Sequence, residues 1–219
     1  MFQAHKNLDY REQALSSGGI HTCAILDNGN VSCWGYGSSG RLGHGWTSDK
    51  TTPTLTSSLG TGRTAVALSS GDYHTCAILD NGAVSCWGEG SDGRLGHGWT
   101  SDRYDPTPTN SLGTGRTAVA ISSGYRHTCA ILDNGDVSCW GRGTYGRLGN
   151  GGTSDKSTPT LTSSLGTGRT AVALSSGGSH TCAILDNGSA MCWGDDSAGQ
   201  LGDGGSSATI HHSPVLVSG

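Results

Sequence analysis

The sequence predicts an all-β protein built from four copies of one unit. The block His-Thr-Cys-Ala-Ile-Leu-Asp-Asn-Gly begins at His21, His74, His127 and His180, so the repeat period is 53 residues. No segment shows the 3.6-residue apolar period of an amphipathic helix. Glycine accounts for 38 of the 219 residues and punctuates every unit. Together these observations favour short strands joined by tight turns.

Each unit contains a hairpin whose register follows from its cysteines. In the first unit, residues 21–26 and 30–34 are strand-like runs separated by Asp27-Asn28-Gly29, a strong turn signal. A three-residue loop with Gly29 in the left-handed conformation places Cys23 opposite Cys33. A two-residue turn would place Cys23 opposite Trp34 instead. The cysteine spacing therefore favours the three-residue loop.

Two further strands are predicted in each unit. Residues 65–68 form a short apolar run, and residues 53–55 suit an edge strand, where Pro53 is tolerated. About four strands in roughly 50 residues is the size of a β-propeller blade. We therefore expect four propeller-type repeats over residues 14–219, with units that begin near residues 14, 67, 120 and 173. Residues 1–13 are interpreted as an N-terminal segment or cap.

The cysteines are predicted to staple these units. Hydrophobic residues make up only 33% of the chain and aromatic residues 6%, which is little for a conventional core. Facing positions in antiparallel strands lie within disulfide reach. We expect the bonds Cys23–Cys33, Cys76–Cys86, Cys129–Cys139 and Cys182–Cys192, each worth roughly 2–3 kcal/mol. The alternatives are reduced thiols that act as small core residues, or zinc ligands, although no short Cys-x-x-Cys pair occurs.

Paired cysteines indicate an oxidising compartment, so we expect an extracellular or periplasmic protein. Residues 1–13 are polar and charged and lack the apolar centre of a signal peptide. The expectation of secretion therefore implies either that a leader was removed or that the chain is part of a longer secreted protein.

The combined motifs identify a family resemblance. The order Ser-Ser-Gly-x-x-His-Thr-Cys-Ala-Ile-Leu, Asp-Asn-Gly-x-Val-Ser-Cys-Trp-Gly, Gly-Arg-Leu-Gly-His-Gly and Thr-Pro resembles the regulator of chromosome condensation repeat. In that family the third element usually reads Gly-Gln-Leu-Gly; Gln200 keeps this Gln, whereas Arg41, Arg94 and Arg147 replace it. The resemblance covers residues from about 14 to 219 and implies propeller blades. The family's usual ring has seven blades, and this chain has four.

The resemblance also implies what such a chain does. Relatives in this family include guanine-nucleotide exchange factors for a small nuclear GTPase and secreted inhibitors of β-lactamases. Paired cysteines fit the secreted, inhibitor-like or adhesin-like role better than the nuclear one.

Composition and charge exclude several other classes. The 13 Lys and Arg residues against 17 Asp and Glu residues leave a net charge of −4, and no basic run occurs, so we expect no nucleic-acid partner. No stretch of about 18 apolar residues is present, so we expect no membrane span. No arrangement of acid, base and nucleophile stands out, and we expect neither catalysis nor a cofactor. Gly60-Thr61-Gly62-Arg63-Thr64 lacks the spacing of a phosphate loop and is interpreted as a turn between units.

The four units differ mainly in two places, directly before the repeated His and directly after the repeated Trp-Gly. Because His21 is predicted to lie opposite Gly35, both places fall at the same end of each hairpin. Tyr and Arg, which occur there, are favoured at protein interfaces. The candidate binding residues are Tyr36, Asp72, Tyr73, Glu89, Tyr125, Arg126, Arg142 and Tyr145. The alternative is drift in unrestrained loops, because the hairpin-tip position also varies.

No metal site is predicted. The repeated histidines could form a ring of metal ligands if four blades closed, but we interpret them as partly buried groups hydrogen-bonded to the backbone. Asp195-Asp196 is interpreted as a solvated turn rather than a calcium site.

The sequence therefore predicts a non-catalytic extracellular protein that presents a protein- or glycan-binding surface on one propeller face. The alternative is a structural protein that assembles with itself, as a closed ring of two chains or as a helical filament of open arrays.

Overall fold

The protein is described by a computed structural model, which places residues 14–205 and 209–218. Within these residues the chain forms four antiparallel sheets of four strands each, as predicted. The first sheet comprises β1 (Leu15–Ser17), β2 (His21–Ile25), β3 (Val31–Gly35) and β4 (Lys50–Leu55). The second comprises β5 (Ala65–Ser70), β6 (His74–Leu79), β7 (Val84–Gly88) and β8 (Arg103–Pro108). The third comprises β9 (Ala118–Ser123), β10 (His127–Leu132), β11 (Val137–Gly141) and β12 (Lys156–Leu161). The fourth comprises β13 (Ala171–Ser176), β14 (His180–Leu185), β15 (Ala190–Asp195) and β16 (Ile210–Leu216).

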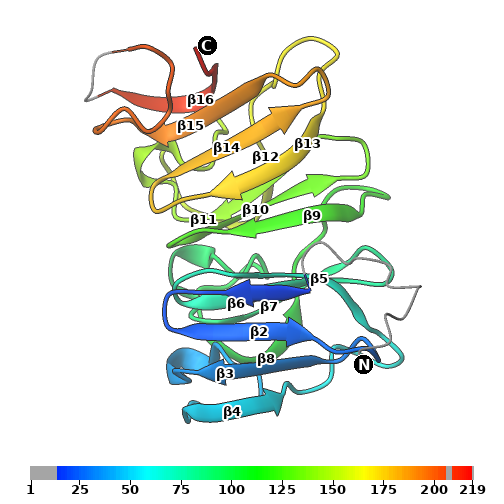
Figure 1. The fold of residues 1–219 in the computed structure, drawn as a ribbon. Helices are drawn as coiled ribbons and strands as arrows, with labels where there is room; N and C mark the ends of the chain where they lie inside the picture. Colours follow the sequence, from blue (N-terminus) through cyan, green and yellow to red (C-terminus); the bar gives the residue numbers. More distant parts are fainter. Residues whose placement is uncertain (1–13, 206–208, 219) are drawn as a thin grey trace, which may run out of the picture.

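Consecutive sheets stack face to face as blades, in the order of the sequence (Figure 1). The innermost strands β5, β9 and β13 lie side by side and line a hollow of about 360 Å³. Val66, Val119 and Val172 occupy the same place on these three strands and remain exposed. The strand order within each sheet follows the chain, so every connection between neighbouring strands of one blade is local.

The central hairpin of each blade has the predicted register. Cys23 faces Cys33 and His21 faces Gly35. The Leu26 amide donates to the Asn30 carbonyl at 2.8 Å, and Gly29 has a φ of +78°, which a three-residue loop requires. The loop length thereby decides which side chains face each other across the two strands.

Four disulfides join the hairpins, in the predicted pairs. Each pair has a Cα–Cα distance of 4.1 Å, which is typical of opposed residues outside the hydrogen-bonded ladder. Six of the eight cysteines lie within three core clusters of the described residues, together with Leu42, Leu95, Leu148 and three of the four repeated tryptophans. Each core cluster contains residues of two successive sheets, so burial depends on stacking.

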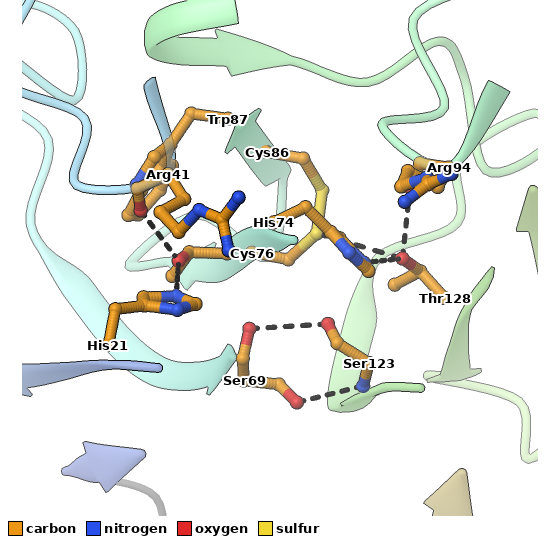
Figure 2. The surroundings of a disulfide bond; sticks show 11 residues. His21, Arg41, Ser69, His74, Cys76, Cys86, Trp87, Arg94, Ser123 and Thr128 are labelled. Carbon is orange, nitrogen blue, oxygen red and sulfur yellow. Dashed lines mark hydrogen bonds between the residues drawn. A yellow bond between two sulfur atoms is a disulfide. The ribbon is translucent and has the colours of Figure 1, made fainter. Parts of the chain in front are cut away.

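Hydrogen bonds between polar side chains repeat at every blade interface. At the interface of the second and third blades, His74 Nε2 donates to Thr128 Oγ1 at 2.7 Å, and Thr128 donates to the Arg94 carbonyl at 2.9 Å. The Ser123 amide donates to Ser69 Oγ at 2.8 Å. Figure 2 shows these contacts on either side of the Cys76–Cys86 bond. The same bonds recur at the other two interfaces, from His21 to Thr75 and from His127 to Thr181.

The last strand belongs to its own blade. Strand β16 pairs with β15 and completes the fourth sheet. The predicted cap over residues 1–13 lies outside the described residues. Three single-turn 3-10 helices, η1 (Ser38–Gly40), η2 (Ser91–Gly93) and η3 (Thr144–Gly146), add structure that the sequence pattern did not predict.

Candidate binding face

The two variable places converge on one edge of the stacked blades, at the end of the hairpins opposite to the Asp-Asn-Gly turns. The strand register puts the residue before each repeated His beside the residue after the repeated Trp-Gly: the Tyr36 amide donates to the Ile20 carbonyl at 3.0 Å, and the Glu89 amide to the Tyr73 carbonyl at 3.0 Å. We call this edge the Tyr–Arg face. It comprises Tyr36, Asp72, Tyr73, Glu89, Asp92, Tyr125, Arg126, Arg142 and Tyr145.

Tyr73 and Tyr125 form the centre of the Tyr–Arg face. Their hydroxyl oxygens are 3.0 Å apart, and their rings meet edge to face with centroids 5.2 Å apart. The guanidinium of Arg126 lies 5.2 Å from the centre of the Tyr125 ring. The hydrogen bond with Tyr73 and the neighbouring Arg126 lower the pKa of Tyr125. Two rings and one cation from neighbouring blades therefore form a single contact group.

A row of buried arginines lies beneath this face. Arg41, Arg94 and Arg147 are each at most 3% exposed. Arg41 is sandwiched between Tyr36 and Tyr73, at 5.1 Å and 5.3 Å from the ring centres. The Nη1 atom of Arg41 donates to the Asp72 carbonyl of the next blade at 2.8 Å. The guanidinium groups of Arg41 and Arg147 therefore join neighbouring blades, and all three guanidinium groups lie against tyrosine rings.

Arg94 differs from its two counterparts in its partners. It pairs with Asp92 at 3.0 Å and with Glu89 at 3.4 Å, and Asp92 also lies 3.5 Å from Arg126. Burial lowers the pKa of Arg94, and the two carboxylates oppose that shift. Arg94 Nη1 and Arg126 Nε are enclosed atoms that find no hydrogen-bond partner among the described residues. Two guanidinium donors at this face are therefore unsatisfied.

The remaining predicted residues lie at the third blade. Tyr145 sits over Arg147 at 5.6 Å and is 43% exposed. Arg142 Nε donates to Thr144 Oγ1 at 3.1 Å. Sequence reasoning had not included Arg41, Arg94 and Arg147 in the face. The sequence signal that could have indicated their role was an arginine in three units at the position where the family usually has Gln.

Three residues at corresponding positions, two of them in the Tyr–Arg face, have strained backbones. Ser39, Asp92 and Tyr145 have φ values of 57°, 60° and 64°, in the left-handed region that favours glycine. They occupy the same position in η1, η2 and η3, and the turn at that position directs two of them, Asp92 and Tyr145, into contact with the arginines. Non-glycine residues in this region cost free energy, about 1–3 kcal/mol each, and such strain is common at functional sites.

The repeated histidines tie the blades together. The prediction that they bond to the backbone is wrong for His21, His74 and His127, because each Nε2 bonds to a threonine hydroxyl of the next blade. Each Nδ1 is buried and finds no hydrogen-bond partner within residues 14–205 and 209–218. Burial, followed by the charge of nearby arginines, lowers the pKa of His21 to about 4 and of His127 to about 3. These imidazoles are therefore neutral donors.

The interpretation of Asp195-Asp196 as a solvated turn is wrong for Asp196. Asp196 is 1% exposed, and its Oδ1 accepts a hydrogen bond from the Leu201 amide at 2.9 Å. Oxygen atoms of Asp196 and Asp203 and a ring nitrogen of His211 lie within 4.8 Å of one another. These residues are the group in the described part of the chain that could hold a metal ion.

Two exposed tryptophans were also missed. Trp46 and Trp99 are 73% and 68% exposed and hold the same position in the first two units, where the third unit has Gly152. Among the described residues, no helix has the length and apolar character needed to cross a bilayer.

Comparison with known proteins places these units in one family. Two sequence profiles described as Regulator of chromosome condensation (RCC1) repeat match residues 13–41, 65–94, 118–147 and 171–200, and residues 28–78, 81–131 and 134–184. The human E3 ubiquitin-protein ligase HERC2 is 38% identical over 185 residues, which cover 84% of this chain and 4% of the ligase. The Ultraviolet-B receptor UVR8 of Arabidopsis thaliana is 37% identical over 191 residues, 87% of this chain and 43% of the receptor.

Solved structures agree on the fold. The crystal structure of human WBSCR16 superposes with a TM-score of 0.83 at 21% identity, covering 97% of this chain and 55% of that chain. Prp20p from Saccharomyces cerevisiae superposes with a TM-score of 0.78 at 23% identity, covering 93% and 49%. This chain spans less than half the length of the curated relatives named above.

Proposed function

The chain belongs to the regulator of chromosome condensation (RCC1) repeat family, and we propose that it is a non-catalytic binding module whose Tyr–Arg face receives an acidic segment of a partner protein. The arrangement that carries this proposal is the contact group of Tyr73, Tyr125 and Arg126 above the buried arginines. Tyrosine and arginine supply most of the binding energy in many protein interfaces.

The charge of the face favours an acidic partner. Arg126 is an exposed cation at the centre of this edge: its side chain is 31% exposed, whereas Arg41, Arg94 and Arg147 lie buried beneath it. The exposed part of the Arg126 guanidinium offers N–H donors to a partner, whereas Arg126 Nε and Arg94 Nη1 are enclosed. A carboxylate from a partner would satisfy such donors with charge-assisted hydrogen bonds.

Pre-organisation is the second argument. The hydroxyl contact of Tyr73 with Tyr125 and the ring contacts of Arg41 restrain these side chains before any partner arrives. A restrained face loses less conformational entropy on binding. The strained φ values of Asp92 and Tyr145 also favour pre-organisation, because this backbone conformation directs the two side chains toward the Tyr–Arg face.

The experiment compares two arginines of one blade. The full chain is titrated against an array of Glu- and Asp-rich peptides, with Lys-rich and neutral peptides of equal length. We expect Arg126→Ala to weaken binding of acidic peptides at least about tenfold, the range of interface hot spots. Arg116→Ala is the matched control, because Arg116 is 38% exposed and pairs with Asp133 at the opposite end of the hairpin.

The two variants separate a site from a general charge effect. Equal losses in Arg126→Ala and Arg116→Ala, or no preference for acidic peptides, would refute the proposal. A second array of neutral glycans tests the other ligand class: binding that depends on Trp46 or Trp99, and not on Arg126, would assign the protein to glycan recognition instead.

A second candidate function is self-assembly, with a second copy of this chain as the partner. The leading end presents Thr22 and Trp34, which are partly exposed, whereas Thr75, Thr128, Trp87 and Trp140 are fully buried at internal interfaces. The trailing end presents Ser175 and His180. They hold the positions of Ser69, which accepts a hydrogen bond from the next blade, and of His74, which donates one to it. The two ends therefore carry the two halves of an interface that occurs three times within the chain.

Light scattering coupled to size-exclusion chromatography tests this assembly. We expect a dimer or a concentration-dependent series, and Trp34→Arg should reduce it to monomer, while Trp46→Arg should not. A monomer at all concentrations up to about 0.1 mM, a concentration above the Kd of a functional interface, would refute head-to-tail association.

We also propose that the protein resides in an extracellular or periplasmic compartment. Four disulfides support this, because such bonds persist where thiols are not kept reduced. Free-thiol titration of the denatured chain isolated from its native source tests the proposal, and eight free thiols would refute it.

A further inference from the structure

The last blade departs from the other three at positions that come together in space. Asp196 stands where the earlier units have Gly37, Gly90 and Gly143. Asp203 stands where they have His44, His97 and Asn150. His211 stands where they have Lys50, Arg103 and Lys156. Three separate sequence changes therefore replace a glycine, a neutral side chain and a cation by two carboxylates and an imidazole.

The backbone of the last blade makes room for the first of these changes. In the first blade a Cβ on Gly37 would collide with the Ser48 carbonyl, so no side chain fits there. In the last blade the Asp196 amide donates to the Thr209 carbonyl at 3.1 Å, and the loop leaves space for a buried carboxylate.

Each carboxylate is held by a backbone amide through one oxygen. Asp196 Oδ1 accepts from the Leu201 amide at 2.9 Å, and Asp203 Oδ1 accepts from the Gly205 amide at 2.7 Å. Asp203 Oδ2 lies 3.0 Å from His211 Nε2. Asp196 Oδ2 is buried and has no hydrogen-bond partner among the described residues. Backbone bonds of this kind orient metal ligands and leave the second oxygen free.

A cation at this point would balance the charge of the two carboxylates. A buried carboxylate oxygen without a partner is costly unless a proton or a cation satisfies it. The sequence contains no Lys or Arg after Arg169, so the imidazole of His211 is the cluster's own possible source of positive charge. A divalent ion would offset both carboxylates at once.

We propose that Asp196, Asp203 and His211 form a Zn²⁺ site that fastens strand β16 to the loop after β15. Two carboxylate oxygens and one imidazole nitrogen are zinc ligands, and a water molecule completes four-coordination. Ca²⁺ is disfavoured because it takes six to eight oxygen ligands. The site would stabilise the outer strand of the last blade.

The test measures Zn²⁺ binding to the full chain after chelator treatment and dialysis. We expect one equivalent bound by calorimetry and a rise in the thermal midpoint. Asp196→Asn keeps an oxygen for the Leu201 amide and removes the charge, so we expect Zn²⁺ affinity to fall at least about tenfold. His211→Lys restores the residue type of the other blades and should abolish both effects. His212→Ala, on the exposed neighbour in β16, should change neither.

Several results would overturn the proposal. Unchanged Zn²⁺ affinity in both Asp196→Asn and His211→Lys would place the ion on other histidines. Absence of any Zn²⁺-dependent rise in the midpoint of the parent would remove the site. A rise of equal size with Ca²⁺ that survives His211→Lys would show an oxygen-only site instead of the proposed one.

Discussion

The hydroxyl of Thr128 is predicted to be a principal link between the second and third blades. Thr128 is fully buried, accepts from His74 Nε2 at 2.7 Å and donates to the Arg94 carbonyl at 2.9 Å. Thr128→Val preserves the shape of the side chain and leaves both partners buried without a bond. Each such loss costs about 1–2 kcal/mol, so we expect unfolding to become easier by about 2–4 kcal/mol.

Thr22→Val is the matched control. Thr22 occupies the same position in the first blade, is partly exposed and makes no side-chain hydrogen bond to a described residue. We expect its effect to be within about 0.5 kcal/mol, as for ordinary surface changes. The contrast between the two variants therefore isolates the buried hydrogen bonds from the change of residue type.

Urea denaturation followed by tryptophan fluorescence measures the difference, with the disulfides intact. Taking a slope of roughly 3 kcal/mol/M, Thr128→Val should lower the midpoint by about 1 M. If the interface opens before the blades unfold, the transition should also broaden, because stacked units couple only to their neighbours. Equal midpoints for Thr128→Val and Thr22→Val would refute the role assigned to these bonds.

Three further predictions follow from other contacts. As the pH falls from 7 to 5, the unfolded chain takes up protons on histidines that stay neutral when folded, so the free energy of unfolding should fall by up to about 1.4 kcal/mol per pH unit for each such histidine. His127, whose folded pKa is about 3, is one of them, and His127→Gln should make the urea midpoint depend less on pH. A parent midpoint that stays constant over this range would contradict the reasoning. Replacing Cys129 and Cys139 together by Ala should cost about 2–3 kcal/mol in the same assay, and an unchanged midpoint would contradict the assigned bond. Arg116→Ala, which breaks the exposed 3.2 Å pair with Asp133, should change stability by less than about 1 kcal/mol, and a larger loss would show that the pair is shielded from solvent.

The candidate face shows how far internal comparison of repeats can reach. Tyr73 and Tyr125 lie 52 residues apart in the chain, and their variation between units indicated a common edge. Their contact was not predictable, because it depends on how far one blade is displaced from the next. The burial of Arg94 beneath them depends on the same displacement.

The cluster of Asp196, Asp203 and His211 was missed for a related reason. Asp195-Asp196 reads as a polar turn, because adjacent carboxylates usually lie in solvent. Asp203 and His211 are separated from it by loop residues without a ligand spacing that a motif would reveal. The cluster becomes visible only when β15 and β16 are paired and the loop between them is folded back.

The sequence by itself determined the unit: its length, its hairpin register and its disulfide pairs. These depend on local rules, because loop length and strand alternation decide which residues of one hairpin face each other. Only the tertiary structure decided what lies between units. The His74–Thr128 bond, the sandwiched Arg41 and the neutral state of the buried imidazoles all depend on the distance and angle between stacked sheets. The nearly identical repeats have the same local sequence and therefore the same hairpin structure, and the packing of one blade on the next gives each copy its own environment.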